Sequence, residues 1–87
     1  MTTKITIYAT TWCPDCYRIE RVLTEHNIPF EKIDIERVAG AAEIVMKHTG
    51  GKHVVPTVVV RTQSAEAVFV NPRPLQLLEA LSAAEQL

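Results

Sequence analysis

The stretch Trp12-Cys13-Pro14-Asp15-Cys16 decides how this chain is interpreted. It holds both cysteines, two residues apart, between a run with β alternation and a run with helical periodicity. If Cys13 caps the helix and Pro14 is its first residue, the Cys13 sulfur lies beside backbone N–H groups that have no partner within the helix. The positive end of the helix dipole favours an anion there, so we expect the Cys13 thiol to ionise at lower pH than a free cysteine.

A Cys-x-x-Cys pair in this setting is typical of thioredoxin-like redox motifs. Easier ionisation makes Cys13 above all a better leaving group, because a more acidic thiol is also a weaker nucleophile. Cys16 follows one helical turn later and is close enough to form a disulfide with Cys13. A purely structural disulfide is the alternative, but a loop this short constrains the unfolded chain little. We therefore predict that the two cysteines are redox-active.

Length and composition predict one small globular domain covering residues 1–87. The chain is 47% hydrophobic and 22% charged, as in ordinary soluble proteins. Its net charge of −1 argues against a nucleic-acid-binding protein. No signal-peptide pattern precedes the first strand, and the longest apolar run, 54–60, is too short to cross a membrane. We expect a cytoplasmic monomer, in which a cysteine pair is more often catalytic than structural.

The first half of the chain predicts a strand, a helix and a second strand. Apolar residues alternate from Ile5 to Ala9, which is the β period. Ile19 and Leu23 then follow at helical spacing, with Val22 beside them, and the helix should end near His26, ahead of Pro29. Residues 30–35 alternate again. Strands this close, joined by a helix, form a right-handed unit with parallel strands.

The second half predicts a helix ended by Gly50-Gly51, a hairpin of residues 54–60 and 67–70, and a last helix. Asn71 as N-cap with Pro72 at the first position marks the expected start of that helix. Two stripes should be buried: Val38, Ala41, Ala42 and Val45 on the earlier helix, and Leu75, Leu78 and Leu81, with Leu77 beside them, on the last one. Ligands should gather at the carboxyl ends of the strands, where the cysteines lie.

The order β-α-β-α-β-β-α, the Cys-x-x-Cys helix start and a later Val55-Pro56-Thr57 together resemble the glutaredoxins. That resemblance implies an α/β, thioredoxin-like fold with a four-stranded mixed sheet flanked by three helices. Several stretches are similar to the mycoredoxin branch of the family, whose members reduce mixed disulfides formed with mycothiol: Tyr8 to Cys13, Asp34-Ile35-Glu36, Gly50-Gly51, Val55 to Val58 and Asn71-Pro72.

The resemblance implies a thiol–disulfide oxidoreductase with no tightly bound cofactor and mycothiol, or another low-molecular-weight thiol, as co-substrate. Cys13 would attack and Cys16 would resolve the mixed disulfide. Pro56 would be cis beside the cysteines, and the Val55 backbone would pair with the substrate's main chain. The predicted substrate-binding residues are Trp12, Pro14, Val55, Pro56, Tyr8 and Asn71, although Tyr8 could equally be core. The expected partners are mycothiol, mycothiolated proteins, and a thioredoxin reductase or mycothiol disulfide reductase.

Two departures from the glutaredoxin pattern bear on the thiol. The Gly-Gly-acidic stretch that holds one end of glutathione is replaced by Val70-Asn71-Pro72. The basic residue often found shortly before the first cysteine is replaced by Thr10-Thr11. Both differences weaken a glutathione interpretation. The Cys-Pro-Asp-Cys motif itself, however, is nearer to glutaredoxins than to the Cys-Gly-Tyr-Cys of many mycoredoxins.

Two alternatives stay open. A small zinc module could use Cys13 and Cys16 with His48 and His53, but 31 residues separate the pairs where about 12–15 are expected. The second is a dithiol electron donor of the NrdH or thioredoxin type, fed by a thioredoxin reductase. Such donors usually carry an aromatic and glycine-containing stretch near the last helix, which residues 69–74 lack.

Overall fold

The protein is a four-stranded mixed sheet with helices on both faces, here in a computed structural model that describes residues 3–63 and 65–85. Spatially, the strands run β2-β1-β3-β4, with β2 parallel to β1 and the other two pairs antiparallel. In chain order the elements are β1 (Lys4–Ala9), α1 (Pro14–Glu25), β2 (Glu31–Asp34), α2 (Ala41–Thr49), β3 (Thr57–Arg61), β4 (Glu66–Val70) and α3 (Pro74–Glu85). This order and sheet confirm the fold predicted from the sequence.

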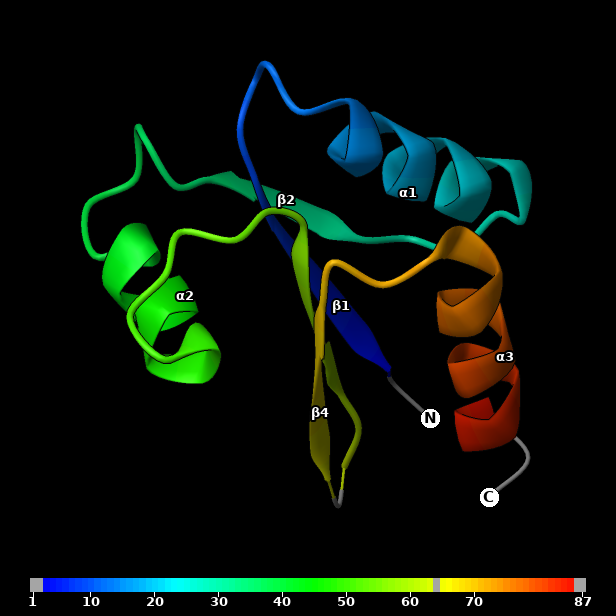
Figure 1. Ribbon diagram of the computed structural model, residues 1–87. Coiled ribbons are helices and arrows are strands. Elements are labelled where there is room, and N and C mark those ends of the chain that lie inside the picture. Colours follow the sequence, from blue (N-terminus) through cyan, green and yellow to red (C-terminus); the bar gives the residue numbers. More distant parts are fainter. Residues whose placement is uncertain (1–2, 64, 86–87) are drawn as a thin grey trace.

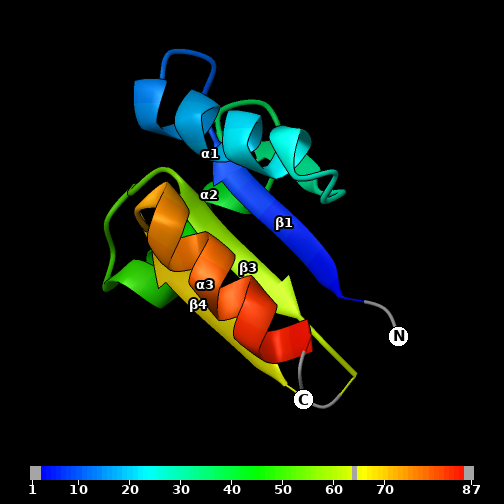
Figure 2. The same cartoon turned by 90° about the vertical axis from the view of Figure 1, so that its right-hand side faces the viewer.

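Two hydrophobic clusters lie on opposite faces of the sheet. Ile7 of β1 packs with Ile19 of α1 and Leu77 of α3 on one face, in the cluster that also holds both cysteines. Tyr8, the next residue of β1, packs with Val45 of α2 on the other face. The alternation of β1 therefore sends successive side chains to opposite layers. Figure 1 shows α2 on one side of the sheet and α1 and α3 on the other, and Figure 2 looks onto α1 and α3.

The strand boundaries differ from the predicted ones by a few residues. β2 is shorter than residues 30–35 at both ends, β4 begins one residue early at Glu66, and β3 begins only after Pro56 and runs on through Arg61. Proline has no N–H to donate to a strand ladder, which explains the late start of β3. Thr62 N–H donates to the Ala65 carbonyl oxygen at 2.8 Å and closes the β3–β4 turn.

Helix α2 begins later than its apolar pattern suggested. The N–H groups of Arg37 and Val38 both donate to the Asp34 carbonyl oxygen, so these residues form a turn before the helix. Gly40 then takes a left-handed φ of 82°, and Gly50, with φ of 73°, ends the helix as predicted. Val38 is consequently 48% exposed, and its assignment to the buried stripe is wrong, whereas Ala41 and Val45 are buried.

The predicted start of the last helix is also wrong. Asn71 is not an N-cap, because it has a left-handed φ of 47° and α3 begins at Pro74. The first helical hydrogen bond runs from Leu77 N–H to the Arg73 carbonyl oxygen, so Pro74 rather than Pro72 takes the first position. The buried stripe of the helix also differs from the expected one. Leu75 is 68% exposed, while Leu77 and Leu81 are buried.

Candidate active site

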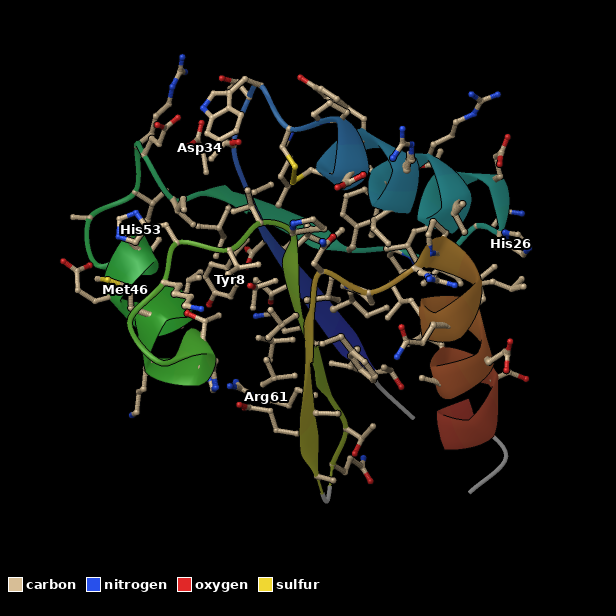
Figure 3. The ribbon with its side chains drawn as sticks, in the orientation of Figure 1. Tyr8, His26, Asp34, Met46, His53 and Arg61 are labelled. Atoms are coloured by element: carbon tan, nitrogen blue, oxygen red, sulfur yellow. A yellow bond between two sulfur atoms is a disulfide. The ribbon has the colours of Figure 1, made fainter. Side chains whose placement is uncertain are left out.

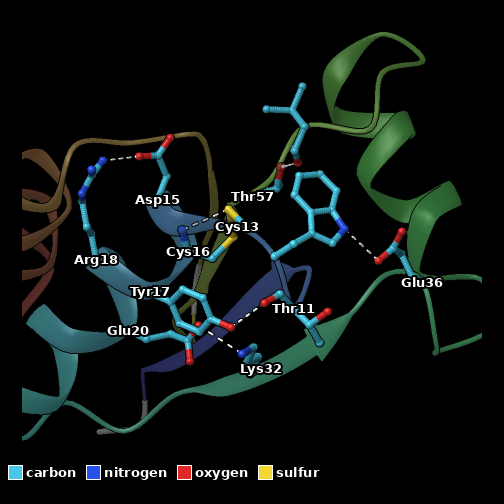
Figure 4. Close-up of a disulfide and its surroundings, with 12 residues drawn as sticks. Thr11, Cys13, Asp15, Cys16, Tyr17, Arg18, Glu20, Lys32, Glu36 and Thr57 are labelled. Atoms are coloured by element: carbon cyan, nitrogen blue, oxygen red, sulfur yellow. Dashed lines mark hydrogen bonds and ion pairs between the residues drawn. A yellow bond between two sulfur atoms is a disulfide. The ribbon is translucent and has the colours of Figure 1, made fainter.

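The two cysteines lie on the turn that connects the carboxyl end of β1 to α1, and they form a disulfide (Figure 4). Their Cα atoms are 5.2 Å apart, well within the range that a disulfide spans. Because β1 is a central strand, the turn is anchored on both sides by neighbouring strands. The sequence placed this turn correctly at the carboxyl end of the first strand.

The start of α1 has the local geometry that the sequence predicted. Cys13 is the N-cap, with extended backbone angles, and Pro14 is the first helical residue. The Cys13 sulfur accepts a hydrogen bond from the Cys16 N–H at 3.1 Å. A sulfur held at this end of the helix receives a free N–H group and the positive end of the dipole, which together stabilise a thiolate when the disulfide is reduced.

Both cysteines belong to the core as much as to the surface. Cys13 is 4% exposed and Cys16 is completely buried, packed with Ile19, Leu77 and the central strands. Cys16 therefore faces more protein than Cys13 does. Because Cys13 is only slightly exposed, an incoming thiol has a narrow approach to its sulfur.

Trp12 forms an exposed wall next to Cys13. Trp12 is 66% exposed, and its indole Nε1–H donates to Glu36 Oε1 at 3.1 Å. Glu36 lies in the segment between β2 and α2, and its backbone N–H donates to Asp34 Oδ1 at 2.9 Å. The dashed line that ends at Glu36 in Figure 4 marks the indole contact.

The segment before β3 lies on another side of the site. The Val55–Pro56 peptide is cis, and Val55 packs against the cluster that holds the cysteines. Thr57, the first residue of β3, donates from its hydroxyl to the Val54 carbonyl oxygen at 2.7 Å (Figure 4). Asn71 N–H donates to the Pro56 carbonyl oxygen at 2.8 Å, so the β4–α3 connection braces this segment.

The glutaredoxin family model matches residues 5–65 of the chain. The chain belongs to the glutaredoxin family. A protein of Mycobacterium tuberculosis that is provisionally named a glutaredoxin is 43% identical over 58 residues, which cover 67% of this chain and 69% of that protein. Mycoredoxin 1 of Corynebacterium glutamicum is 36% identical over 55 residues, which cover 63% of this chain and 67% of that one. This glutaredoxin is therefore a thiol–disulfide oxidoreductase with a cysteine pair, of a family that works with low-molecular-weight thiols and reductases.

Solved structures support the thioredoxin-like fold of this glutaredoxin. The solution structure of glutaredoxin from Brucella melitensis matches with a TM-score of 0.63 at 18% identity, covering 95% of this chain and 85% of that one. At that identity the likeness concerns the fold alone. Within the described residues 3–63 and 65–85, no helix is long and apolar enough to cross a membrane.

The other predicted site residues of this glutaredoxin are scattered. Pro14 is exposed at the helix start beside the cysteines. Tyr8 lies in the core of the opposite face and is 9% exposed, so the structure does not bring it to the disulfide. Asn71 contributes a backbone contact to Pro56, and its side chain is exposed. Whether any of them binds substrate stays a prediction.

The arrangement does not support the zinc alternative. His48 is exposed in the last turn of α2, and His53 is exposed in the segment after it. Among the residues that the structure describes, no group of three or more His, Cys, Asp or Glu side chains could hold a metal ion. The two histidines are therefore not gathered around the cysteines, as a four-ligand site would require.

A small polar cluster of Tyr17, Glu20 and Lys32 contacts the cysteine turn through the Thr11 carbonyl oxygen. Tyr17 donates from its hydroxyl to the Thr11 carbonyl oxygen, and Lys32 Nζ lies 5.3 Å from the Tyr17 ring centroid. Lys32 also forms an ion pair with Glu20 at 3.3 Å without hydrogen-bond geometry, so the buried Glu20 Oε2 has a counter-charge but no donor. Neither the polar cluster nor the Glu36 contact was predicted from the sequence. The contact of Trp12 with Glu36, for example, joins residues 24 positions apart.

Proposed function

We propose that this glutaredoxin reduces mixed disulfides between proteins, or small molecules, and mycothiol, with Cys13 as nucleophile and Cys16 as resolving cysteine. The observation that carries the assignment of roles is the Cys13 sulfur at the N-cap of α1, with the Cys16 N–H 3.1 Å away. Only Cys13 has measurable exposure, because Cys16 is sealed in the core. An external disulfide therefore meets the sulfur that the helix stabilises as a thiolate.

The reaction proceeds by two thiol–disulfide exchanges. The Cys13 thiolate attacks the mycothiol sulfur of the mixed disulfide, and the target protein leaves as a thiolate, which takes up a proton. Cys13 is now joined to mycothiol. A second mycothiol thiolate then attacks that mycothiol sulfur, which forms mycothiol disulfide and releases the Cys13 thiolate. In net terms the target thiol is regenerated and one free mycothiol is oxidised, because it joins the mycothiol of the mixed disulfide as mycothiol disulfide.

Cys16 offers the other way to resolve the same intermediate. Its thiolate attacks the Cys13 sulfur, mycothiol leaves as a thiolate, and the Cys13–Cys16 disulfide forms. That disulfide is the state seen in the structure. A reductase or two further thiols then return it to the dithiol. In this closed state the two Cα atoms are 5.2 Å apart, an ordinary separation for a disulfide.

Trp12 and the Val55–Pro56 segment form the walls between which the substrate docks. Trp12 offers an exposed aromatic surface next to Cys13, and Pro14 continues that surface onto the helix start. Val55 packs on the cysteine cluster, and its backbone would pair with the main chain of the substrate. Asn71 holds the Pro56 carbonyl in place through its N–H.

Mycothiol rather than glutathione is favoured by what surrounds the cysteines. Thr10 and Thr11 replace the basic residue often found shortly before the first cysteine, and Val70-Asn71-Pro72 offers no Gly-Gly-acidic stretch, so both differences weaken a glutathione interpretation. The 36% identity to mycoredoxin 1 points the same way.

The test compares two mixed disulfides of one peptide, one with mycothiol and one with glutathione, each supplied with its own thiol and disulfide reductase. We expect a higher kcat/KM with mycothiol for the wild-type protein. Equal or better turnover of the glutathione form would overturn the assignment of the thiol and leave the oxidoreductase activity in place.

A dithiol donor fed by a thioredoxin reductase is the second candidate. The observation in its favour is that Cys16 is placed to close the disulfide, so the chain can pass on two electrons without a small thiol. A coupled assay with thioredoxin reductase and no mycothiol distinguishes the two. Full turnover under those conditions favours the second candidate, and turnover that depends on mycothiol favours the first.

A further inference from the structure

We propose that Glu36 is a positioning and specificity residue for Cys13: it holds the Trp12 indole beside the reactive cysteine, and its carboxylate disfavours anionic reagents relative to neutral ones. The inference rests on the proposed function in one respect, namely that small thiols are substrates. It concerns a residue that no sequence pattern of the cysteine turn includes. Glu36 lies in the β2–α2 segment, and only the fold brings it to Trp12.

The segment that carries Glu36 is fixed from the sheet side. Its N–H donates to Asp34 Oδ1 at 2.9 Å, and Asp34 is the last residue of β2. The Asp34 carbonyl oxygen accepts from both Arg37 and Val38. Asp34 thus accepts hydrogen bonds from the backbone of Glu36 and of the two residues that follow it. The Glu36 carboxylate therefore reaches Trp12 from a turn whose backbone is hydrogen-bonded to the last residue of β2.

Trp12, in contrast, has little packing to hold it. With 66% of the residue exposed, its indole orientation depends on the hydrogen bond to Glu36 Oε1 at 3.1 Å. A bond to an ionised acceptor is stronger than one between neutral groups. Trp12 is joined directly to Cys13, so a change in the indole position alters the wall nearest to the narrow approach to the Cys13 sulfur.

The Glu36 charge is also unbalanced. Near the site, Arg18 pairs with Asp15 and Arg37 pairs with Asp34 at 3.7 Å, so each of these cations already has a carboxylate partner. None of the ion pairs formed by the described residues includes Glu36. An anionic reagent that comes past Trp12 meets an uncompensated negative charge. For exposed charges within one Debye length, such repulsion is worth about two- to threefold in rate, and salt reduces it.

The experiment alkylates Cys13 in the Cys16→Ser protein with iodoacetamide, which is neutral, and with iodoacetate, which is anionic and nearly the same size. The ratio of the two rates cancels any change in the fraction of thiolate. We expect Glu36→Gln to raise the iodoacetate rate relative to the iodoacetamide rate by about two- to threefold at low salt, and by less at high salt. The matched control is Glu25→Gln, which removes the same charge at the far end of α1, about 18 Å along the helix from Cys13.

The sole tryptophan of the chain reports on the positioning half of the proposal. In Glu36→Gln, the amide oxygen of the introduced glutamine can still accept the indole N–H, so Trp12 emission should stay as in the parent protein. Glu36→Ala removes the acceptor, and both the emission and the rates with both reagents should change. Unchanged emission in Glu36→Ala, or an alkylation ratio in Glu36→Gln equal to that of Glu25→Gln, would overturn the proposal.

This test is independent of the identity of the small thiol, because alkylation needs only the reduced protein. If the glutathione form proves the better substrate while the alkylation ratio responds to Glu36, the mycothiol assignment fails and the role of Glu36 stands. If mycothiol is preferred but the ratio does not respond, the mycothiol assignment stands and Glu36 is not its determinant.

Discussion

The two faces of the sheet use their hydrophobic cores differently. On the face covered by α1 and α3, both cysteines are members of the core, packed with Ile7 and Leu23. On the face covered by α2, the core around Tyr8 and Val45 contains no cysteine. On the first face, residues that carry the chemistry are therefore also part of the core. The core of the second face lies apart from the chemistry.

The helices that cover the two faces also differ in length. α1 has 12 residues and α2 has nine, so α2 is about 4–5 Å shorter and covers less of the sheet. Away from α2 a shallow cavity of about 170 Å³ remains open, and Figure 3 shows Tyr8 near α2 and Arg61 further along the sheet. The cavity is lined by Lys4, Thr6, Tyr8, Glu31, Ile33, Val59 and Arg61.

The largest effect should come from Cys13→Ser. We expect reduction of mixed disulfides to fall about 10³-fold or more, because the nucleophile is gone. Stability under reducing conditions should change by only about 1 kcal/mol or less, because serine is a good N-cap and its hydroxyl can accept the Cys16 N–H in place of the sulfur. Activity assays and urea unfolding measure the two quantities, and a parallel loss of both would contradict the separation of roles.

Cys16→Ser should show the opposite balance. The residue is completely buried, so a hydroxyl there costs about 1–3 kcal/mol of stability if it finds no partner. Reduction of mixed disulfides with small thiols should persist, because the first exchange and its resolution by a second thiol need only Cys13. Dithiol chemistry should be lost. A Cys16→Ser protein that is folded yet inactive toward these mixed disulfides would rule out the one-cysteine mechanism.

The site was predictable from the sequence where the chemistry is local. Cys13, Pro14 and Cys16 lie within one helical turn, and cap preferences and spacing determine their geometry. The similar signal at Asn71-Pro72 failed, because the Asn71 N–H is used to brace Pro56, a residue 15 positions earlier in the chain. A left-handed Asn71 then delays the helix until Pro74.

Contacts between distant segments could not be predicted in the same way. Nothing in the sequence near Trp12 indicates Glu36, because the contact exists only after β2 has paired with β1. Likewise, Val38 fits a helical stripe by spacing, but Asp34 and Gly40 hold it in a turn before α2. Local propensity determined the elements, and the pairing of strands decided which of their ends meet.

Truncations in the two cores should differ in size and in their effect on the site. Leu23→Ala should cost about 2–5 kcal/mol, since the residue is fully buried in the cysteine-containing core. Val45→Ala removes less hydrocarbon from the α2 face and should cost about 1–3 kcal/mol. We expect the folded Val45→Ala protein to keep its activity within about twofold, because changes at distant sites act independently. Urea unfolding and kcat/KM of the two variants, compared at equal folded fraction, measure this; a larger activity loss in Val45→Ala than in Leu23→Ala would contradict it.

The smallest effect should come from Tyr8→Phe, which removes only a hydroxyl. Tyr8 lines the open cavity on the α2 face, and its ring packs in the cluster that does not contain the disulfide. We expect stability to change by about 0.5 kcal/mol or less and kcat/KM to stay as in the wild type. If kcat/KM for small-thiol mixed disulfides instead fell about tenfold at unchanged stability, Tyr8 would bind substrate after all. The chemistry would then reach through the sheet to its second face, and the separation of roles between the two faces would no longer hold.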